Sequence, residues 1–170
     1  MRVTVMSDTH LPRRARDLPP ELWKAVDDAD VVIHAGDWVS ADLLDQLEGR
    51  SKRLIGCFGN NDGDDIRARL PEIAETTLEG VRISVIHETG AAQGRETRCA
   101  IQFPDTDLLI FGHSHIPWDS VASTGLRLLN PGSPTDRRRQ PFGTYHTLEL
   151  RDSGIHSVKL HSLPTRKVER

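Results

Sequence analysis

Apolar and polar residues follow different patterns in the two halves of the chain. In the first half, short apolar runs typical of buried strands alternate with stretches spaced like amphipathic helices. The expected strands cover residues 3–6, 30–35 and 52–58. The expected helices begin at Pro19, at Ser40 (ending just before Gly49) and at Asp62, the last reaching Leu70. Strands separated by helices predict parallel pairing.

Hairpin signals dominate the second half. Three pairs of strand-like segments flank short turns that contain glycine, and a helix and one further strand stand between the first two pairs. The pairs are 74–78 with 81–87, 118–122 with 126–129, and 143–150 with 155–160, while the helix covers 92–103 and the strand 108–111. This order predicts the α/β class, with two mixed sheets packed face to face and helices outside.

Length and composition predict one globular domain over residues 1–162, followed by a polar tail over 163–170. No apolar run has the length of a membrane span, and the first strand leads directly into Asp8, which leaves no room for a signal peptide. We therefore expect a cytoplasmic protein. Cys57 and Cys99 are expected to be reduced core residues.

A net charge of −3 argues against bulk binding of long nucleic acid. The basic run Arg137–Arg139 has two interpretations: a solvated loop, which is the commoner case, or a rim that attracts a phosphorylated substrate.

Seven potential metal ligands stand in five clusters, and each cluster follows an expected strand. They are Asp8 and His10, Asp37, Asn60, His87, and His113 and His115. Because ligands of open α/β sheets bind beyond the carboxyl ends of strands, these groups can converge on one place. Three oxygen and four nitrogen ligands suit two transition-metal ions if one carboxylate bridges them. The pattern predicts a dinuclear metal hydrolase.

Spacing within the clusters supports this interpretation. Residues i and i+2 of an extended backbone point the same way, so Asp8 with His10, and His113 with His115, could each face one ion. Glycine precedes Asp37, Asn60 and His113, which allows a sharp turn and a close approach of the backbone. Asp37 is the carboxylate without a chelating neighbour in its cluster, and is therefore the expected bridge.

Each group also has a purely structural interpretation. A lone Asp after a strand is usually a cap or turn residue, and a lone His usually satisfies a local hydrogen bond. On that basis we interpret His34 as a core histidine and leave out His146, His156 and His161. The functional interpretation is favoured because independent structural needs would rarely place five such clusters in this order, all at strand ends.

Taken together, the five clusters resemble the motifs of the calcineurin-like metallophosphoesterases. More narrowly, they are similar to the small YfcE-type phosphodiesterase branch that includes the sorting protein Vps29. The segment Asn130-Pro131-Gly132-Ser133 is similar to a C-terminal segment of that branch. The resemblance covers about residues 1–160 and implies a four-layer αββα sandwich of two mixed β-sheets flanked by helices, with the metals at the sheet edge.

The resemblance also implies roles for the seven residues. Asp8, His10 and His115 would hold one ion, Asn60, His87 and His113 the other, and Asp37 would bridge them. Asp37, Asn60 and His113 are the residues expected to act directly in catalysis. Two positions depart from the family pattern: Asn61 stands where His or Cys is frequent, and Thr89 stands where a second, substrate-facing His is usual.

The expected activity is hydrolysis of a phosphodiester, in a small molecule or nucleotide, by a hydroxide that bridges two divalent transition-metal ions. Mn²⁺ is the expected ion, with Ni²⁺, Fe²⁺ or Zn²⁺ as alternatives. Two other functions stay open, a non-catalytic protein-binding scaffold like Vps29 and a phosphomonoesterase. No membrane partner is expected, and a homo-oligomer is compatible with the sequence.

Overall fold

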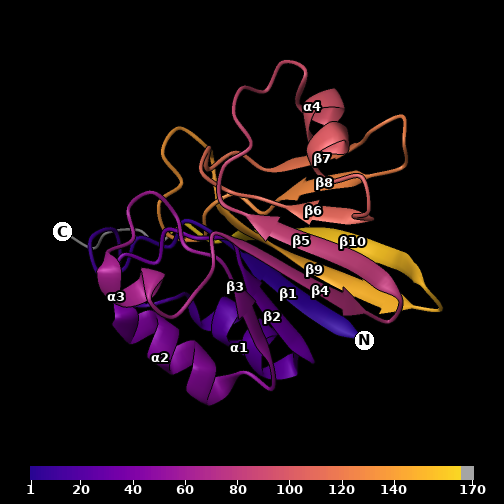
Figure 1. The fold of residues 1–170 in the computed structure, drawn as a ribbon. Helices are drawn as coiled ribbons and strands as arrows, with labels where there is room; N and C mark the ends of the chain where they lie inside the picture. Colours follow the sequence, from indigo (N-terminus) through magenta and orange to yellow (C-terminus); the bar gives the residue numbers. More distant parts are fainter. Residues whose placement is uncertain (166–170) are drawn as a thin grey trace.

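Two five-stranded sheets pack face to face, with helices on the outer face of each (Figure 1). The computed structural model describes residues 1–165, so residues 166–170 of the expected polar tail lie outside it. The first sheet has the order β10-β9-β1-β2-β3 and consists of β1 (Arg2–Met6), β2 (Val31–His34), β3 (Leu54–Gly56), β9 (Gly143–Arg151) and β10 (Gly154–Leu163). The second has the order β4-β5-β6-β8-β7 and consists of β4 (Ile73–Leu78), β5 (Val81–Ile86), β6 (Leu108–Ile110), β7 (Trp118–Val121) and β8 (Arg127–Asn130).

The helices complete a four-layer αββα arrangement. They are α1 (Pro20–Asp28), α2 (Ala41–Arg50), α3 (Asp64–Arg67) and α4 (Arg95–Gln102). Helices α1 and α2 cover the first sheet, and α4 covers the second (Figure 1). Both sheets are mixed: β1, β2 and β3 pair in parallel and β9 is antiparallel to β1, while β5, β6 and β8 pair in parallel between antiparallel edge strands. The expected fold class is confirmed.

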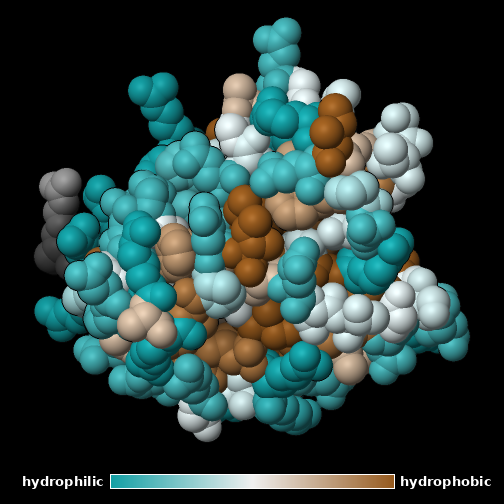
Figure 2. Space-filling model, in the orientation of Figure 1, coloured by the Kyte–Doolittle hydropathy of each residue, from teal (hydrophilic) through white to brown (hydrophobic). Residues whose placement is uncertain are grey.

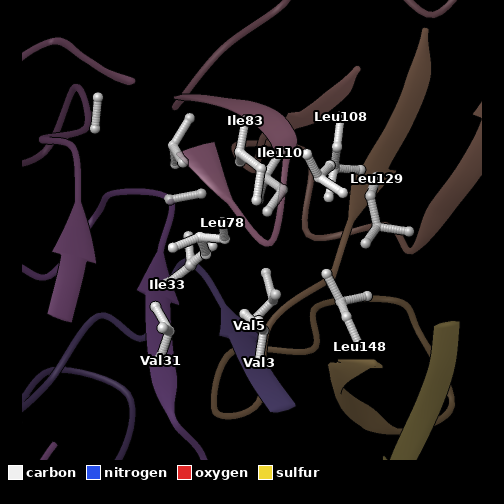
Figure 3. Packing of buried hydrophobic residues seen from close by; sticks show 14 of the residues in the cluster. Val3, Val5, Val31, Ile33, Leu78, Ile83, Leu108, Ile110, Leu129 and Leu148 are labelled. Carbon is white, nitrogen blue, oxygen red and sulfur yellow. The ribbon is translucent and has the colours of Figure 1, made fainter. Parts of the chain in front are cut away.

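The core between the sheets consists of aliphatic side chains that point toward one another from both layers (Figure 3). Val5 and Ile33 of the first sheet and Leu108 and Ile110 of the second are each 0% exposed. Apolar burial contributes about 25 cal/mol per Å², so this contact is the main force that holds the layers together. Cys57 belongs to this core and Cys99 to the core under α4, and both are free, as expected.

Several element ends differ from the expectation. Ser40 caps α2 by accepting a hydrogen bond from the Asp42 N–H, as predicted, but the helix continues through Gly49 to Arg50. The prediction that Gly49 lies beyond the end was wrong, because a helix tolerates one exposed glycine when Ser51 can end it instead. Helix α4 begins at Arg95 and not at residue 92, since Gly94 directly before it has φ +71.

Strand register brings five loops to one edge of the sandwich. Met6 pairs with His34 and His34 with Gly56, so β1, β2 and β3 end at the same level. In the second sheet Val85 pairs with Ile110, which aligns the ends of β5 and β6. All five clusters of potential ligands therefore start from the same side of the molecule. Within residues 1–165, no helix is long and apolar enough to cross a membrane.

We expect Leu108→Ala to lower the free energy of unfolding by about 2–5 kcal/mol, because it removes a fully buried side chain from between the sheets and leaves a cavity. Ile101→Ala is the control, since Ile101 is 76% exposed and its loss should change stability by less than about 0.5 kcal/mol. Urea unfolding of both variants measures the difference. Equal effects would contradict the placement of the main core between the layers.

Candidate metal centre

Residues from both sheets meet where the strand ends converge. The potential ligand atoms of Asp8, His10 and His115 lie within 4.8 Å of one another, and so do those of Asp8, Asp37 and His87. All five side chains are buried. The sequence therefore identified a group of side chains that the fold brings together from residues more than 100 positions apart.

The two carboxylates lie among the imidazoles. Asp37 Oδ2 is 3.3 Å from His10 Nε2 and 3.3 Å from His87 Nε2. Asp8 Oδ1 is 3.4 Å from His115 Nε2 and slightly farther from His10 and His87, at 3.8 and 3.7 Å. Asp37 is thus placed between the two imidazoles that a bridging carboxylate would connect, and Asp8 is central to the cluster as well.

Asn60 and His113 lie at the open rim of this group. His113 Nδ1 is 3.1 Å from Asn60 Oδ1, and the His113 ring makes an edge contact with His87 at 5.3 Å between centroids. The His113 side chain is 43% exposed, unlike the five buried residues. Asn60 is exposed as well, so these two residues face the solvent.

Four buried polar atoms in the group have no hydrogen-bond partner among residues 1–165. They are Asp8 Oδ1, His10 Nε2, His87 Nε2 and His115 Nε2. Buried polar atoms in native proteins are nearly always paired, because an unsatisfied one costs about 1–3 kcal/mol. Four such atoms that lie around one place, all of them of types that ligate transition metals, fit a bound cation.

Backbone carbonyls determine which imidazole nitrogen faces the centre. His87 Nδ1 is 2.7 Å from the Ala35 carbonyl, and His115 Nδ1 is 2.5 Å from the Asp136 carbonyl. A carbonyl only accepts, so both Nδ1 atoms carry a hydrogen, and in the neutral imidazole each Nε2 atom has the free lone pair. This outer contact is the usual way in which metal-ligating imidazoles are oriented.

Both carboxyl groups are held in the ionised form. Burial alone would raise the pKa of Asp8 and Asp37, but contacts with His10 and His87 outweigh burial and lower both pKa values, that of Asp37 well below its usual range. Burial likewise opposes the charged form of His10, yet its contacts with Asp37 and Asp8 raise its pKa to about 9. The group therefore offers two anionic oxygen donors, which strongly favour a cation between them.

The ligand loops have left-handed backbones. Asp8, His10, Asp37, His113 and His115 all have positive φ, between +47 and +71. The expectation that extended backbone aims Asp8 and His10 at one ion was wrong in its geometry, although the two side chains do meet. Residues other than glycine rarely adopt this conformation, and backbone strain of this kind concentrates at functional sites.

Hydrogen bonds between the loops hold this strained backbone. The Asp8 N–H donates to the Gly36 carbonyl at 3.0 Å, and the His10 N–H donates to the Asp37 carbonyl at 3.1 Å. Asp8 Oδ2 accepts from the His113 N–H at 2.9 Å, which connects the two sheets. Gly112 is required here, since a Cβ at this position would lie 2.0 Å from Ser7 Oγ.

Asp62 positions the loops after β2 and β3, a role that the sequence did not reveal. Its buried carboxylate accepts the N–H of Asp37 at 3.0 Å, of Gly59 at 2.7 Å and of Val39 at 2.7 Å. The spacing Gly59-Asn60-Asn61-Asp62 was the available signal, but its targets are backbone groups, which sequence does not mark. Asp62 supports the centre without facing it.

Asn61 also contacts Asp37. Its N–H and its side-chain amide donate to the two carboxylate oxygens of Asp37, at 2.9 and 2.8 Å. Where the family resemblance indicates His or Cys, this chain therefore has an amide directed at the Asp37 carboxylate. At the other position that departs from the family pattern, the hydroxyl of Thr89 is buried and has no hydrogen-bond partner in the described part of the chain.

The segment Asn130-Pro131-Gly132-Ser133, which precedes β9, holds the loops of the centre from outside. Ser133 Oγ donates to the Asp8 carbonyl at 2.7 Å, and Asn130 Nδ2 donates to the Gly112 carbonyl at 3.0 Å. Asn130 and Ser133 therefore hold the two loops that carry the Asp-x-His and His-x-His pairs. Neither side chain is itself among the potential ligands.

The remaining histidines lie apart from the centre or behind it. His34 is fully buried and stacks on Trp38 with 3.7 Å between ring centroids, and burial lowers its pKa to about 3. It is a core histidine, as predicted. His146 pairs with β1 in the register of the first sheet, and His161 stacks on Tyr145 and contacts Thr147, so both serve the sheet.

A groove of about 430 Å³ adjoins the centre on the side of Asn60 and His87. Phe58, Arg67 and Glu88 also line it. The Arg67 guanidinium lies over the Phe58 ring at 4.4 Å and donates to the Asp62 carbonyl, which fixes this wall. A molecule with one group at the centre can place the rest in this groove.

Comparisons with known proteins agree with this geometry. A family model described as the calcineurin-like phosphoesterase superfamily domain matches residues 1–153. A probable metallophosphoesterase of Methanothermobacter thermautotrophicus is 33% identical over 79% of this chain and 78% of its own length. Phosphodiesterase MJ0936 of Methanocaldococcus jannaschii is 30% identical over 68% of this chain and 74% of its own length.

Solved structures include a similar fold. Vps29 of Entamoeba histolytica, determined in complex with Zn²⁺, superposes with a TM-score of 0.77. It is 24% identical, and the match covers 96% of this chain and 98% of that one. At this level of identity the likeness shows the architecture of the two sheets and their helices.

We expect Asp62→Asn to weaken binding of Mn²⁺ roughly tenfold or more, although Asp62 is not a candidate ligand. The asparagine would direct an amide N–H toward a backbone N–H, and the lost hydrogen bond would loosen the two loops that Asp62 holds. The free energy of unfolding should fall by about 1–3 kcal/mol. The matched control is Asp64→Asn, which makes the same change at an exposed position two residues away. Calorimetric titration with Mn²⁺ compares the two, and equal affinities would contradict the positioning role.

Proposed function

Since the chain belongs to the calcineurin-like phosphoesterase superfamily, we propose that it is a metal-dependent phosphodiesterase with a dinuclear centre. The observation that carries this proposal is the set of four buried, unpartnered nitrogen and oxygen atoms around one place. A phosphoesterase of this kind needs cations to bind the phosphoryl oxygens, and these atoms are the donors that such cations require. The name of the archaeal relative, a phosphodiesterase, supports the choice of a diester.

The proposed ligand sets follow from the clusters. Asp8, His10 and His115 would hold one ion, Asn60, His87 and His113 the other, and Asp37 would bridge them. The close grouping of Asp8, His10 and His115 supports the first set, and the contact of His113 with Asn60 supports the second. The position of Asp37 Oδ2, equally far from His10 and His87, supports the bridge. Mixed nitrogen and oxygen donors favour Mn²⁺, with Ni²⁺, Fe²⁺ or Zn²⁺ as alternatives.

The chain's own residues have separate tasks in this mechanism. When bound, the two ions would supply Lewis acidity toward the phosphoryl oxygens and toward water. Asp37, Asn60 and His113 touch the reacting group: Asp37 between the two halves of the centre, and Asn60 with His113 at the rim where a phosphoryl oxygen arrives. Asn61 and Asp62 hold Asp37 in place. The groove beside Asn60 would receive one of the two ester groups.

The two departures from the family pattern predict a preference among substrates. Asn61 is directed at Asp37 and the Thr89 hydroxyl is buried, so neither position supplies a proton to a leaving group. General acid catalysis is worth roughly 10²-fold or more where it operates. Substrates whose leaving group departs without protonation should therefore react best.

A non-catalytic scaffold is the alternative from another class. The likeness to Vps29 supports it at the level of the fold. Loss of ligands would favour the scaffold, and all seven candidate ligands are present in this chain, which favours the enzyme.

Asp37→Asn should abolish phosphodiester hydrolysis and remove at least one metal equivalent, because it removes the negative charge of the one carboxylate that both ions would share. The fold should persist, since the amide keeps the shape of the side chain. Metal content by mass spectrometry, circular dichroism and turnover are measured together, with Asp64→Asn as the control. Near wild-type turnover of Asp37→Asn would reject the bridging assignment.

Metal removal tests the activity itself. The metal-loaded protein should hydrolyse bis(p-nitrophenyl) phosphate. A chelator should abolish this activity, and addition of Mn²⁺ or Ni²⁺ should restore it. The monoester p-nitrophenyl phosphate should be cut more slowly. A faster monoester reaction would favour the phosphomonoesterase, and absence of both reactions in protein with full metal content would favour the scaffold.

A further inference from the structure

Two arginine-bearing loops lie side by side at the rim of the metal centre. Segment 11–18, after β1, contains three arginines, and segment 134–142, before β9, contains three more. The acidic residues in these segments are Asp17 and Asp136. The whole chain has 22 basic and 25 acidic residues, so this local excess of positive charge is not a property of the surface in general.

Contacts join the two loops to each other and to the centre. Arg14 Nε is 3.4 Å from Asp136 Oδ2, and Thr135 Oγ1 donates to the Thr9 carbonyl, between Asp8 and His10. The Asp136 carbonyl orients His115. Figure 1 shows both loops on the left side of the molecule, and Figure 2 shows hydrophilic surface there. The two loops that carry the arginines therefore contact the segments of His10 and His115, whereas the groove is lined by Asn60 and His87.

The arginines divide into two kinds. Arg14 and Arg137 hold the loops, since Arg14 pairs with Asp136 and Arg137 donates to the Gln140 carbonyl at 2.6 Å. Arg13, Arg16, Arg138 and Arg139 are exposed, and none makes a side-chain hydrogen bond or ion pair within residues 1–165. Structural needs of the loops thus account for two of the six.

Arg138 is the free arginine with the clearest relation to the centre. Arg138 lies two residues after Asp136, and the carbonyl of Asp136 contacts His115. The backbone of Arg138 is left-handed, with φ +48. Arg138 therefore belongs to the loop that holds His115 in place.

We propose that Arg138, with the other free arginines of the two loops, forms a subsite for a second phosphate group of the substrate. The subsite rests on the proposed phosphodiesterase function and narrows its substrate class to phosphodiesters that carry a further phosphate, such as phosphorylated nucleotides. Guanidinium groups suit this task because they stay charged and bind phosphate oxygens in pairs. The basic region is confined to two loops beside one end of the centre, which fits a single added phosphate and not a long nucleic-acid strand.

The test uses two substrates with the same leaving group, thymidine 5′-(p-nitrophenyl phosphate) and the same compound with an additional 3′-phosphate. The ratio of their kcat/KM values is measured with Mn²⁺ for the wild type, Arg138→Ala and Arg151→Ala. Arg151 is the matched control, because it is exposed and lies at the end of β9 that pairs with the start of β1, away from the centre.

We expect the wild type to prefer the 3′-phosphorylated substrate roughly tenfold, the effect of one charge-assisted contact. Arg138→Ala should bring the ratio close to one, whereas Arg151→Ala should keep it. A wild-type ratio near one, or an unchanged ratio in Arg138→Ala, overturns the subsite. A preference that continues to grow in single-stranded oligonucleotides overturns it in favour of a nucleic-acid groove.

A binding measurement separates this inference from the proposed activity. Calorimetry compares thymidine 3′,5′-bisphosphate with thymidine 5′-phosphate on the same three proteins. If no diester is hydrolysed, the phosphodiesterase proposal fails. The subsite is still supported if the wild type binds the bisphosphate more tightly than the monophosphate and Arg138→Ala removes this difference. Equal binding of both nucleotides by the wild type overturns it.

Discussion

Apolar contact between the two sheets determines where everything else in this protein can lie. Val5 and Ile33 on one side and Leu108 and Ile110 on the other are fully buried against each other. Their packing fixes the distance and the orientation of the layers, and strand register then places the ends of β1, β2, β3, β5 and β6 along a common edge. The polar centre exists because an apolar contact beneath it aligns five chain segments.

Above this contact the loops carry strain that only their mutual support makes possible. Five of the seven candidate ligands have left-handed backbones. Each such residue is costly by itself, and the cost is offset by hydrogen bonds from neighbouring loops, by Asp62 beneath the centre and by Asn130 and Ser133 outside it. The ligand geometry is consequently a property of the whole edge and not of any single motif.

The sequence predicted which side chains gather at this edge better than it predicted the backbone geometry that brings them together. Ligand types and their order were visible because each cluster follows a strand, and periodicity identified the strands and the two mixed sheets. Asp62, Asn130 and Ser133 act on backbone groups, and no residue pattern identifies a backbone group as a target. Left-handed φ at Asp8 and His10 was equally hidden, since it arises from contacts between loops that are distant in sequence.

One consequence of this layout concerns how the two halves of the chain stay together. Asp8, His10, Asp37 and Asn60 come from the first sheet, while His87, His113 and His115 come from the second. Ions held by both sets would act as cross-links between layers that otherwise adhere through aliphatic contact. Such a cross-link joins positions up to about 100 residues apart and favours the folded state wherever the ion binds it more tightly than the unfolded chain. The supply of metal would then affect how stably the two sheets stay together as well as the chemistry at their edge.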